Sequence, residues 1–179
     1  MVFISGVHGV GKSYFCNMAK KRLGINTFSA SQLIKERKRS EFSREKLIPD
    51  IDDNQQYLLM AIQDLNATDP NYLLDGHFCL LNAEGQITRI PKDIFIKLNP
   101  NAIVLLTEKP NIIAERRRNR DGIAQCANNI LQFQKMETAY AREVAQVINI
   151  PLKISAGQND FESTLDFVRE IMRRNNNGW

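Results

Sequence analysis

The sequence predicts one α/β domain in three layers, with a parallel sheet of five strands between helices on both faces. Short apolar runs typical of buried strands alternate with amphipathic stretches, which is the pattern of such a sheet. A glycine-rich loop directly follows the first apolar run. The chain length of 179 residues fits a single hydrophobic core. We therefore treat residues 1–179 as one domain.

The N-terminal half is expected to contribute three strands and three helices. Residues 12–23 carry apolar side chains at a helical period, and Gly24 provides a C-terminal stop. A serine, either Ser29 or Ser31, is expected to cap the next helix, and Pro49 interrupts the basic stretch after it. The expected order is a strand at 2–5, a helix at 12–23, a strand near 26–28, a helix from about 29, a helix at 52–66 and a strand at 72–75.

The C-terminal half is expected to begin with a hairpin and to add two parallel strands. Residues 83–85 (Ala, Glu, Gly) lie between two short apolar runs, as in a hairpin turn, and Pro91 and Pro110 mark helix starts. The most hydrophobic run, 102–106, predicts a central strand. The expected order is a hairpin at 78–90, a helix at 91–98, a strand at 102–106, a helix after Pro110, a long helix at 124–148, a strand at 151–154 and a helix at 159–174.

The composition is that of an ordinary globular protein, with 43% hydrophobic and 25% charged residues. The three cysteines, Cys16, Cys79 and Cys126, are widely spaced and odd in number, so they suggest neither a disulfide framework nor a zinc site. A reducing, cytoplasmic setting is therefore expected. We expect no membrane association, since no apolar run reaches the roughly 18 residues of a membrane span. The sequence leaves the oligomeric state open.

The loop GVHGVGKS at 6–13 matches the phosphate-binding pattern GxxxxGK[ST]. Gly6 and Gly11 allow backbone N–H groups to approach a phosphate, and the following helix adds its positive N-terminal end. Lys12 can reach the β- and γ-phosphates, and the Ser13 hydroxyl can ligate Mg²⁺. The motif therefore predicts a P-loop that binds ATP and Mg²⁺.

A carboxylate that binds Mg²⁺ is expected near Ser13, at the end of a strand that neighbours the first strand. Asp75 ends the strand at 72–75 and meets this expectation, although it could instead simply start the next loop. Gly76 allows a ligand to approach the backbone closely. His77 could contact an acceptor phosphate or pack as a polar residue. We do not expect His8 to be catalytic, because variable positions of the loop present backbone and turn side chains away from the phosphates.

Two basic clusters could also meet phosphates. The cluster at 115–120 holds four arginines, whose forked guanidinium groups suit phosphate contact. We expect at least one of them to touch a phosphate, in the order of preference Arg116, Arg120, Arg117 and Arg118. The cluster at 35–46 is either a solvated helix face or a phosphate-binding surface.

The chain resembles the nucleoside monophosphate kinases, and among them the archaeal-type adenylate kinases most. The likeness covers most of the chain. It rests on GVHGVGKS (6–13), LLDGHF (73–78), the hairpin and helix at 79–98, LNPNAIVLLTE (98–108), RRRNRD (116–121) and QFQKMETAYAREVA (132–145). The resemblance implies a P-loop NTPase/kinase fold with a five-stranded parallel sheet, an acceptor-binding region at about 29–66 and a small arginine-bearing lid at about 115–124.

The motif and the resemblance together assign roles to individual residues. Those expected at ATP and Mg²⁺ are Gly6, Gly9, Val10, Gly11, Lys12, Ser13 and Tyr14, with Ser13 and Asp75 at the metal. Lys12, Asp75, Arg116 and Arg120 are the expected catalytic residues, and the two arginines form the lid. The expected acceptor-binding residues are Ser31, Lys35, Gly76, His77 and Arg89. Lys35 stands where many relatives have arginine, and Thr138 replaces another expected arginine, with Arg37, Arg39 and Arg89 as possible substitutes.

These features lead to one main hypothesis, the transfer of the γ-phosphoryl group from ATP to a nucleoside monophosphate. An ATPase that acts as a switch or with nucleic acid is a less favoured alternative, because the cluster at 35–46 has few aromatic residues for base stacking. A kinase for a small non-nucleotide metabolite would have the same core.

Overall fold

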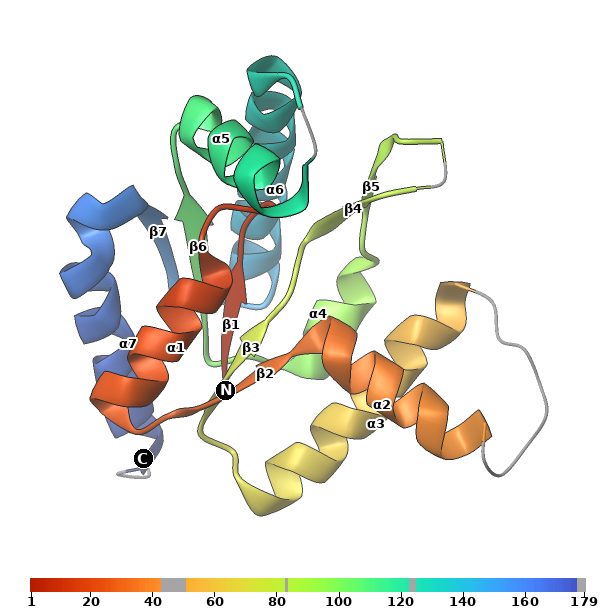
Figure 1. Ribbon diagram of the computed structural model, residues 1–179. Coiled ribbons are helices and arrows are strands. Elements are labelled where there is room, and N and C mark those ends of the chain that lie inside the picture. Colours follow the sequence, from red (N-terminus) through yellow and green to blue (C-terminus); the bar gives the residue numbers. More distant parts are fainter. Residues whose placement is uncertain (43–50, 83, 123–124, 177–179) are drawn as a thin grey trace.

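The computed structural model describes residues 1–42, 51–82, 84–122 and 125–176, and these form a central sheet covered by helices (Figure 1). The strands are β1 (Val2–Ser5), β2 (Asn26–Ser29), β3 (Tyr72–Asp75), β4 (Cys79–Leu81), β5 (Ile87–Arg89), β6 (Ala102–Thr107) and β7 (Leu152–Ala156). The helices are α1 (Lys12–Leu23), α2 (Ala30–Phe42), α3 (Ile51–Thr68), α4 (Lys92–Leu98), α5 (Pro110–Asp121), α6 (Ala127–Val147) and α7 (Phe161–Asn176), with a 3₁₀ turn, η1 (Gly157–Asp160), before α7.

The central sheet has five parallel strands in the order β2-β3-β1-β6-β7, and β4 and β5 form a separate antiparallel hairpin. This arrangement confirms the predicted fold class. The register pairs Ile4 of β1 with Asp75 of β3, so β3 ends beside the start of the glycine-rich loop. Because loops at the carboxyl ends of parallel strands meet at one edge, this edge is where a ligand site is expected.

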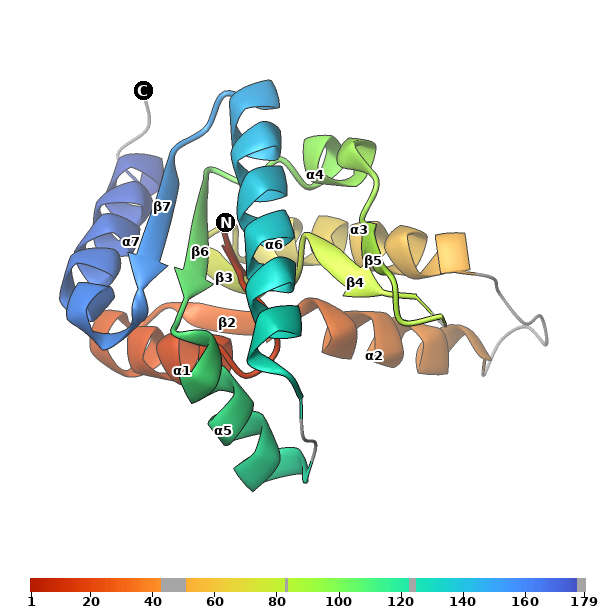
Figure 2. The same cartoon turned by 90° about the horizontal axis from the view of Figure 1, so that it is seen from above.

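Helices cover both faces of the sheet, as Figure 2 shows from above. On one face α1 and α7 meet through the rings of Phe15 and Phe161, whose centroids are 5.7 Å apart. On the other face α4 and α6 meet through Phe95 and Tyr140 at 6.2 Å. The pair α2 and α3 packs together and projects from the β2 edge of the sheet (Figure 1).

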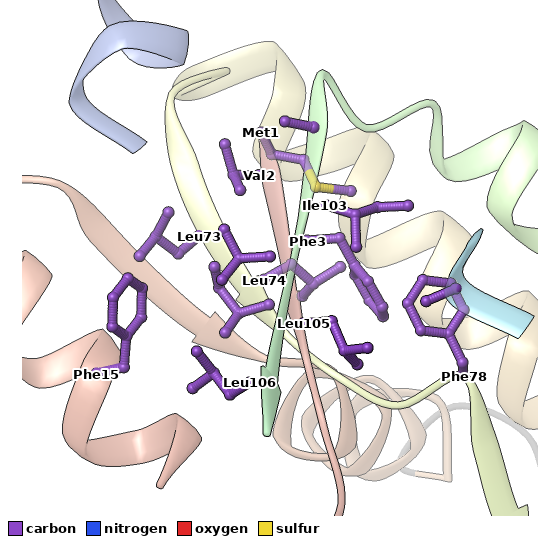
Figure 3. Close-up of a cluster of buried hydrophobic side chains, with 14 of the residues drawn as sticks. Met1, Val2, Phe3, Phe15, Leu73, Leu74, Phe78, Ile103, Leu105 and Leu106 are labelled. Carbon is purple, nitrogen blue, oxygen red and sulfur yellow. The ribbon is translucent and has the colours of Figure 1, made fainter. Parts of the chain in front are cut away.

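The core lies between these layers and centres on the three inner strands. Phe3 packs edge-on against Phe78, with ring centroids 5.2 Å apart (Figure 3). It packs in the same way against Phe95, at 5.6 Å. Leu73 and Ile103, on the two strands that flank β1, are fully buried. Burial on both faces explains why the parallel strands read as continuous apolar runs in the sequence.

Most predicted elements are confirmed, and the differences lie at their ends. Gly24 stops α1 in a left-handed conformation, and its N–H bonds the Lys20 carbonyl. Ser29 directly precedes α2, whereas Ser31 lies inside the helix, so Ser31 cannot be its cap. The long helix begins at residue 127 rather than 124, and the predicted break at Pro49 lies outside the described residues. No helix in the described ranges combines the length and apolar character of a membrane span.

Candidate active site

The glycine-rich loop packs so closely on the sheet that only glycine fits at its start. Gly6 has a φ of 141°, and a Cβ there would lie 2.5 Å from the Leu106 carbonyl oxygen of β6. Gly9 and Gly11 also have positive φ values, 79° and 117°, which other residues rarely adopt. The backbone conformation predicted from the motif therefore depends on these three glycines.

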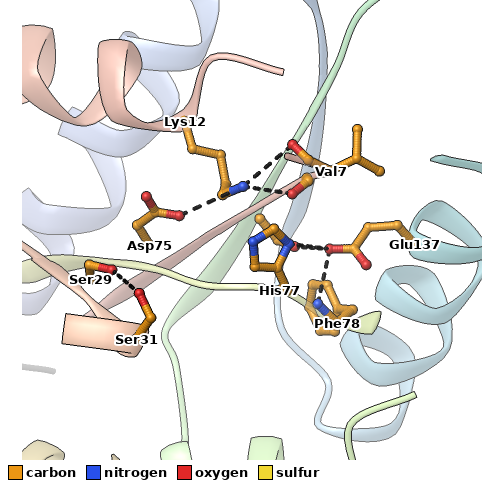
Figure 4. A network of polar contacts seen from close by, with 10 residues as sticks. Val7, Lys12, Ser29, Ser31, Asp75, His77, Phe78 and Glu137 are labelled. Carbon is orange, nitrogen blue, oxygen red and sulfur yellow. Dashed lines mark hydrogen bonds and ion pairs between the residues drawn. The ribbon is translucent and has the colours of Figure 1, made fainter. Parts of the chain in front are cut away.

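Lys12 is folded back over the loop and is nearly buried. Its ammonium group donates to the Gly6 carbonyl at 2.8 Å and lies 4.0 Å from the Asp75 carboxylate (Figure 4). Burial lowers the pKa of Lys12, against the opposing attraction of Asp75 and Glu137. Burial likewise raises the pKa of Asp75, although Lys12 favours the carboxylate. Lys12 and Asp75, a cation and an acid, therefore lie close together where they are largely shielded from water. We call this place the mouth of the loop.

Two oxygen donors for a divalent cation lie at this mouth. Asp75 ends β3 next to β1, and the exposed Ser13 lies in the first turn of α1. Carboxylate and hydroxyl oxygens are hard ligands that suit Mg²⁺, which keeps most of its coordination for water and phosphate oxygens. The donor set therefore fits Mg²⁺, with Ser13 and Asp75 as the residues that would hold it.

One face of α5 lies against the loop. Ile113, Arg116 and Arg117 are spaced three and four residues apart and so share a face, and the two arginines contact the loop backbone. The Arg116 guanidinium donates to the Val10 carbonyl at 3.0 Å, and Arg117 Nε donates to the His8 carbonyl at 2.8 Å. Arg117 is the more deeply buried of the two, with 9% exposed. Arg117 therefore supports the backbone of the loop through this bond, on the side where α5 packs.

The other two arginines of the cluster are free of the loop backbone. Arg120 lies at the cavity and makes a two-bond contact with Asp121, both distances being 2.7 Å. Arg118 points to solvent.

The loop opens into one continuous cavity of about 980 Å³. We divide its lining into two parts on either side of the loop. The lid side consists of Tyr14, Thr107, Glu108, Arg116, Asn119, Arg120, Ser155, Gly157, Gln158 and Phe161. The arm side lies under α2 and α3 and consists of Phe3, Ser29, Ala30, Ser31, Ile34, Gln55, Leu58, Gly76, His77, Leu80, Ile90, Ile94, Phe95 and Leu98.

The cavity brings together most of the residues selected from the sequence. Those that line it are Gly9, Val10, Gly11, Lys12, Ser13, Tyr14, Ser31, Asp75, Gly76, His77, Arg116 and Arg120. Gly6, at the start of the loop, packs against β6 and does not line the cavity. Gly76 has a packing role as well, since a Cβ there would lie 2.7 Å from the Phe3 ring.

Two of the residues expected at the acceptor, Lys35 and Arg89, are not brought to the cavity lining. Lys35 is exposed on α2. Arg89 is held by an ion pair with Glu143 at 3.1 Å and by the Tyr140 ring at 4.7 Å. The hairpin therefore directs this guanidinium toward α6, which the sequence alone did not reveal.

The rings of His8 and His77 lie against each other, with centroids 4.4 Å apart and ring planes tilted by 43°. Burial, with Lys12 nearby, lowers the pKa of His77 to about 2, so its imidazole stays neutral at ordinary pH. Burial also lowers the pKa of the more exposed His8. Neither ring therefore supplies a positive charge to the cavity.

Sequence reasoning missed Glu137, the buried acid that holds the loop after Asp75. It is 1% exposed and accepts a hydrogen bond from the Phe78 amide at 2.9 Å (Figure 4). It also accepts from the Cys79 amide at 2.8 Å and from the Ser5 hydroxyl at 2.5 Å. The signal was present, because Glu137 occupies the apolar stripe of α6. An acid on such a stripe indicates a buried polar network.

Sequence reasoning also missed Gln55. It lies on α3 and is one of the residues that line the arm side, although its Oε1 atom is itself buried and has no hydrogen-bond partner among the described residues.

The sequence profile of a family described as AAA domain matches residues 5–130, more than two thirds of the chain. The chain belongs to the AAA domain family. This stretch of the AAA domain contains the glycine-rich loop, Asp75 and the arginine face of α5.

The resemblance to archaeal adenylate kinases is confirmed at low identity. The chain is 28% identical over 174 residues to the adenylate kinase of Thermococcus onnurineus (strain NA1), covering 89% of the chain and 87% of that protein. It is 27% identical over 188 residues to the adenylate kinase of Pyrococcus horikoshii, covering 97% of the chain and 93% of that protein.

Solved structures confirm the P-loop kinase fold. The YorR protein of Bacillus subtilis, in complex with phosphorylated GDP, has a TM-score of 0.60 at 15% identity and covers 100% of the chain and 99% of its own. Shikimate kinase from Bacteroides thetaiotaomicron has a TM-score of 0.59 at 13% identity, with 96% and 97% covered. At these identities the likeness shows the fold of the chain and nothing finer.

Proposed function

We propose that this chain transfers the γ-phosphoryl group of ATP, with Mg²⁺, to a small acceptor molecule. The observation that carries the proposal is the position of Lys12 and Asp75, which lie between the two sides of one cavity. A triphosphate on the lid side and an acceptor on the arm side would meet at these residues. In-line transfer requires this kind of juxtaposition.

The residues of the chain act by binding and orientation. Loop amides and Lys12 hold the phosphates, and Lys12 exchanges its contact with the Gly6 carbonyl for phosphate oxygens. Ser13 and Asp75 would hold Mg²⁺, which neutralises charge on the β- and γ-phosphates. Arg116 and Arg120 face the same space and stabilise charge that develops during transfer.

The acceptor proposed first is a nucleoside monophosphate. It is supported by the relatives named adenylate kinase, which are matched over most of their length. A small metabolite without a phosphate group is the second candidate. It is favoured by the described lining of the arm side, which contains no arginine.

A coupled assay of ADP formation tests the function. The purified chain is given ATP and Mg²⁺ with a panel of nucleoside monophosphates, nucleosides, sugar acids and simple polyols. At least one acceptor is expected to accelerate ADP formation above basal hydrolysis, and Lys12→Ala should abolish the acceleration. If no acceptor does so, the function is not phosphoryl transfer to a small molecule.

A further inference from the structure

Two arginines of α5 bind alternate carbonyl groups of the glycine-rich loop, which lies beside this helix (Figure 1). Arg117 Nε donates to the His8 carbonyl at 2.8 Å, and the Arg116 guanidinium donates to the Val10 carbonyl at 3.0 Å. Arg117 also lies against the backbone between them, since a Cβ at Gly9 would be 3.0 Å from its Cγ atom. The helix therefore fixes the loop backbone at two peptide groups.

The direction of each bound carbonyl sets the direction of the next N–H group. A peptide group is planar, and in the trans form its C=O and N–H bonds point in opposite directions. The described peptide bonds are trans. The His8 carbonyl points toward α5, so the N–H group of Gly9 points away from that helix. The N–H group of Gly11 points away from α5 for the same reason, because the Val10 carbonyl is bound there.

The two glycines are placed to bind an anion. Gly9 and Gly11 line the cavity and have positive φ values of 79° and 117°. Successive N–H groups in such a backbone form a concave site for a phosphate. The orientation that the arginines impose on the peptide groups is therefore the one that phosphate binding needs.

Arg117 is a cation in a buried place. It is 9% exposed, and burial lowers its pKa. Its guanidinium donates to the His8 carbonyl and to the side-chain oxygen of Gln125, both of which are neutral. Removing a cation from water costs free energy, which neutral acceptors offset only in part. A polyphosphate bound at the loop would supply negative charge close to this guanidinium.

We infer, resting on the triphosphate site of the proposed function, that Arg117 is a positioning residue for phosphate binding. It holds the His8 carbonyl so that the N–H group of Gly9 faces a phosphate oxygen before the ligand arrives. Arg116 acts in the same way on Gly11, in addition to its own place at the cavity. Donors that are oriented in advance need no reorganisation when the anion binds. Arg117 thus acts through the backbone of the loop.

Isothermal titration calorimetry tests the inference on the whole chain, with ATP and with inorganic tripolyphosphate as ligands and Mg²⁺ present. Tripolyphosphate isolates the loop from contacts to a base. Arg117→Met keeps most of the apolar stem without the guanidinium, and Arg117→Lys keeps the charge but has a methylene group in place of Nε. Both variants are expected to raise Kd about 10-fold or more, the effect of one hydrogen bond to a charged group. Arg118→Met removes a charge from an exposed position on the same helix and is the matched control, which should bind like the wild type.

The amide signals of Gly9 and Gly11 report on the two peptide groups separately in proton–nitrogen correlation spectra. In the wild type both amide protons should move downfield when tripolyphosphate is added, because each then donates to an anionic oxygen. In Arg117→Met at saturating tripolyphosphate the Gly9 shift should be lost. The Gly11 shift should remain, since Arg116 still holds the Val10 carbonyl. A purely structural role would change both signals alike.

The results separate failure of the inference from failure of the function. Wild-type affinity in either Arg117 variant would overturn the inference and leave the triphosphate site standing. So would a wild-type Gly9 signal that does not move with tripolyphosphate bound, and this signal decides even if neither variant folds. If the wild type binds neither ATP nor tripolyphosphate, both the inference and the function are overturned. If it binds them but phosphorylates no acceptor, the function alone is overturned.

Discussion

Glu137→Gln should destabilise the protein although it removes a single negative charge and hardly changes the shape of the side chain. The carboxylate accepts from the Phe78 and Cys79 amides and from the Ser5 hydroxyl, all within 2.9 Å. An amide has one acceptor oxygen, so its NH₂ group must face at least one of these donors. The result is a buried backbone N–H without a partner, opposite another donor.

The expected loss follows from the contacts. Hydrogen bonds to a charged acceptor contribute about 1.5 to 3 kcal/mol each, and an unsatisfied buried donor costs about 1 to 3 kcal/mol. Relief from burying a charge offsets part of this. We therefore expect the free energy of unfolding to fall by about 2 to 4 kcal/mol. For a chain of this length that lowers Tm by roughly 4 to 16 °C.

Urea denaturation followed by circular dichroism measures the change. Glu143→Gln is the matched control on the same helix. Among the described residues the ion-pair partners of its carboxylate are Arg89 and Lys92 at the surface, so this variant should unfold like the wild type. A Glu137→Gln midpoint equal to that of the control would refute the reasoning. It would mean that the loop after Asp75 does not depend on this carboxylate.

Three further predictions concern Lys12, Gly76 and His77. Lys12→Ala should lower kcat for ATP turnover by at least about 100-fold with an unchanged circular dichroism spectrum; retained turnover would contradict the role of the ammonium group. Gly76→Ala should destabilise by about 1 to 3 kcal/mol in thermal unfolding, since the new Cβ would lie 2.7 Å from the Phe3 ring, and an unchanged Tm would show that the ring moves aside freely. The pKa of His77 is lowered to about 2 by burial, so the unfolded chain binds more protons below pH 6.5 and stability falls as pH decreases. Between pH 7.5 and 5 this histidine should account for a loss of about 2 kcal/mol, measured as the difference in pH dependence between wild type and His77→Gln; equal pH profiles would argue against the buried neutral ring.

The fold was predictable because its signals are local. The strands at 2–5 and 72–75 have the predicted bounds, since continuous apolar runs between turn residues read as buried parallel strands. The helix at 12–23 and its stop at Gly24 were also predicted, because periodicity and a C-terminal glycine act within a few residues. The start of α6 was three residues off, since helix ends depend on tertiary contacts that the sequence does not show.

The site was only partly predictable, because long side chains choose among distant partners. Arg89 was expected to bind the acceptor. Its guanidinium instead pairs with Glu143 and lies over the Tyr140 ring, both on α6. Arg117 ranked third among the four arginines, after Arg116 and Arg120, yet it is the arginine whose side chain donates to the His8 carbonyl.

By itself the sequence determined the phosphate-binding loop, its lysine and the acid at the end of a neighbouring strand. It could do so because glycine conformation and chain direction at strand ends are properties of the local backbone. Only the tertiary structure decided the character of the arm side, where Phe3, Phe95 and Gln55 come together from three elements. It also decided that Glu137, far along the chain, holds the loop after Asp75. Burial and charge pairing are set by which elements pack together, and spacing along the chain does not carry that information.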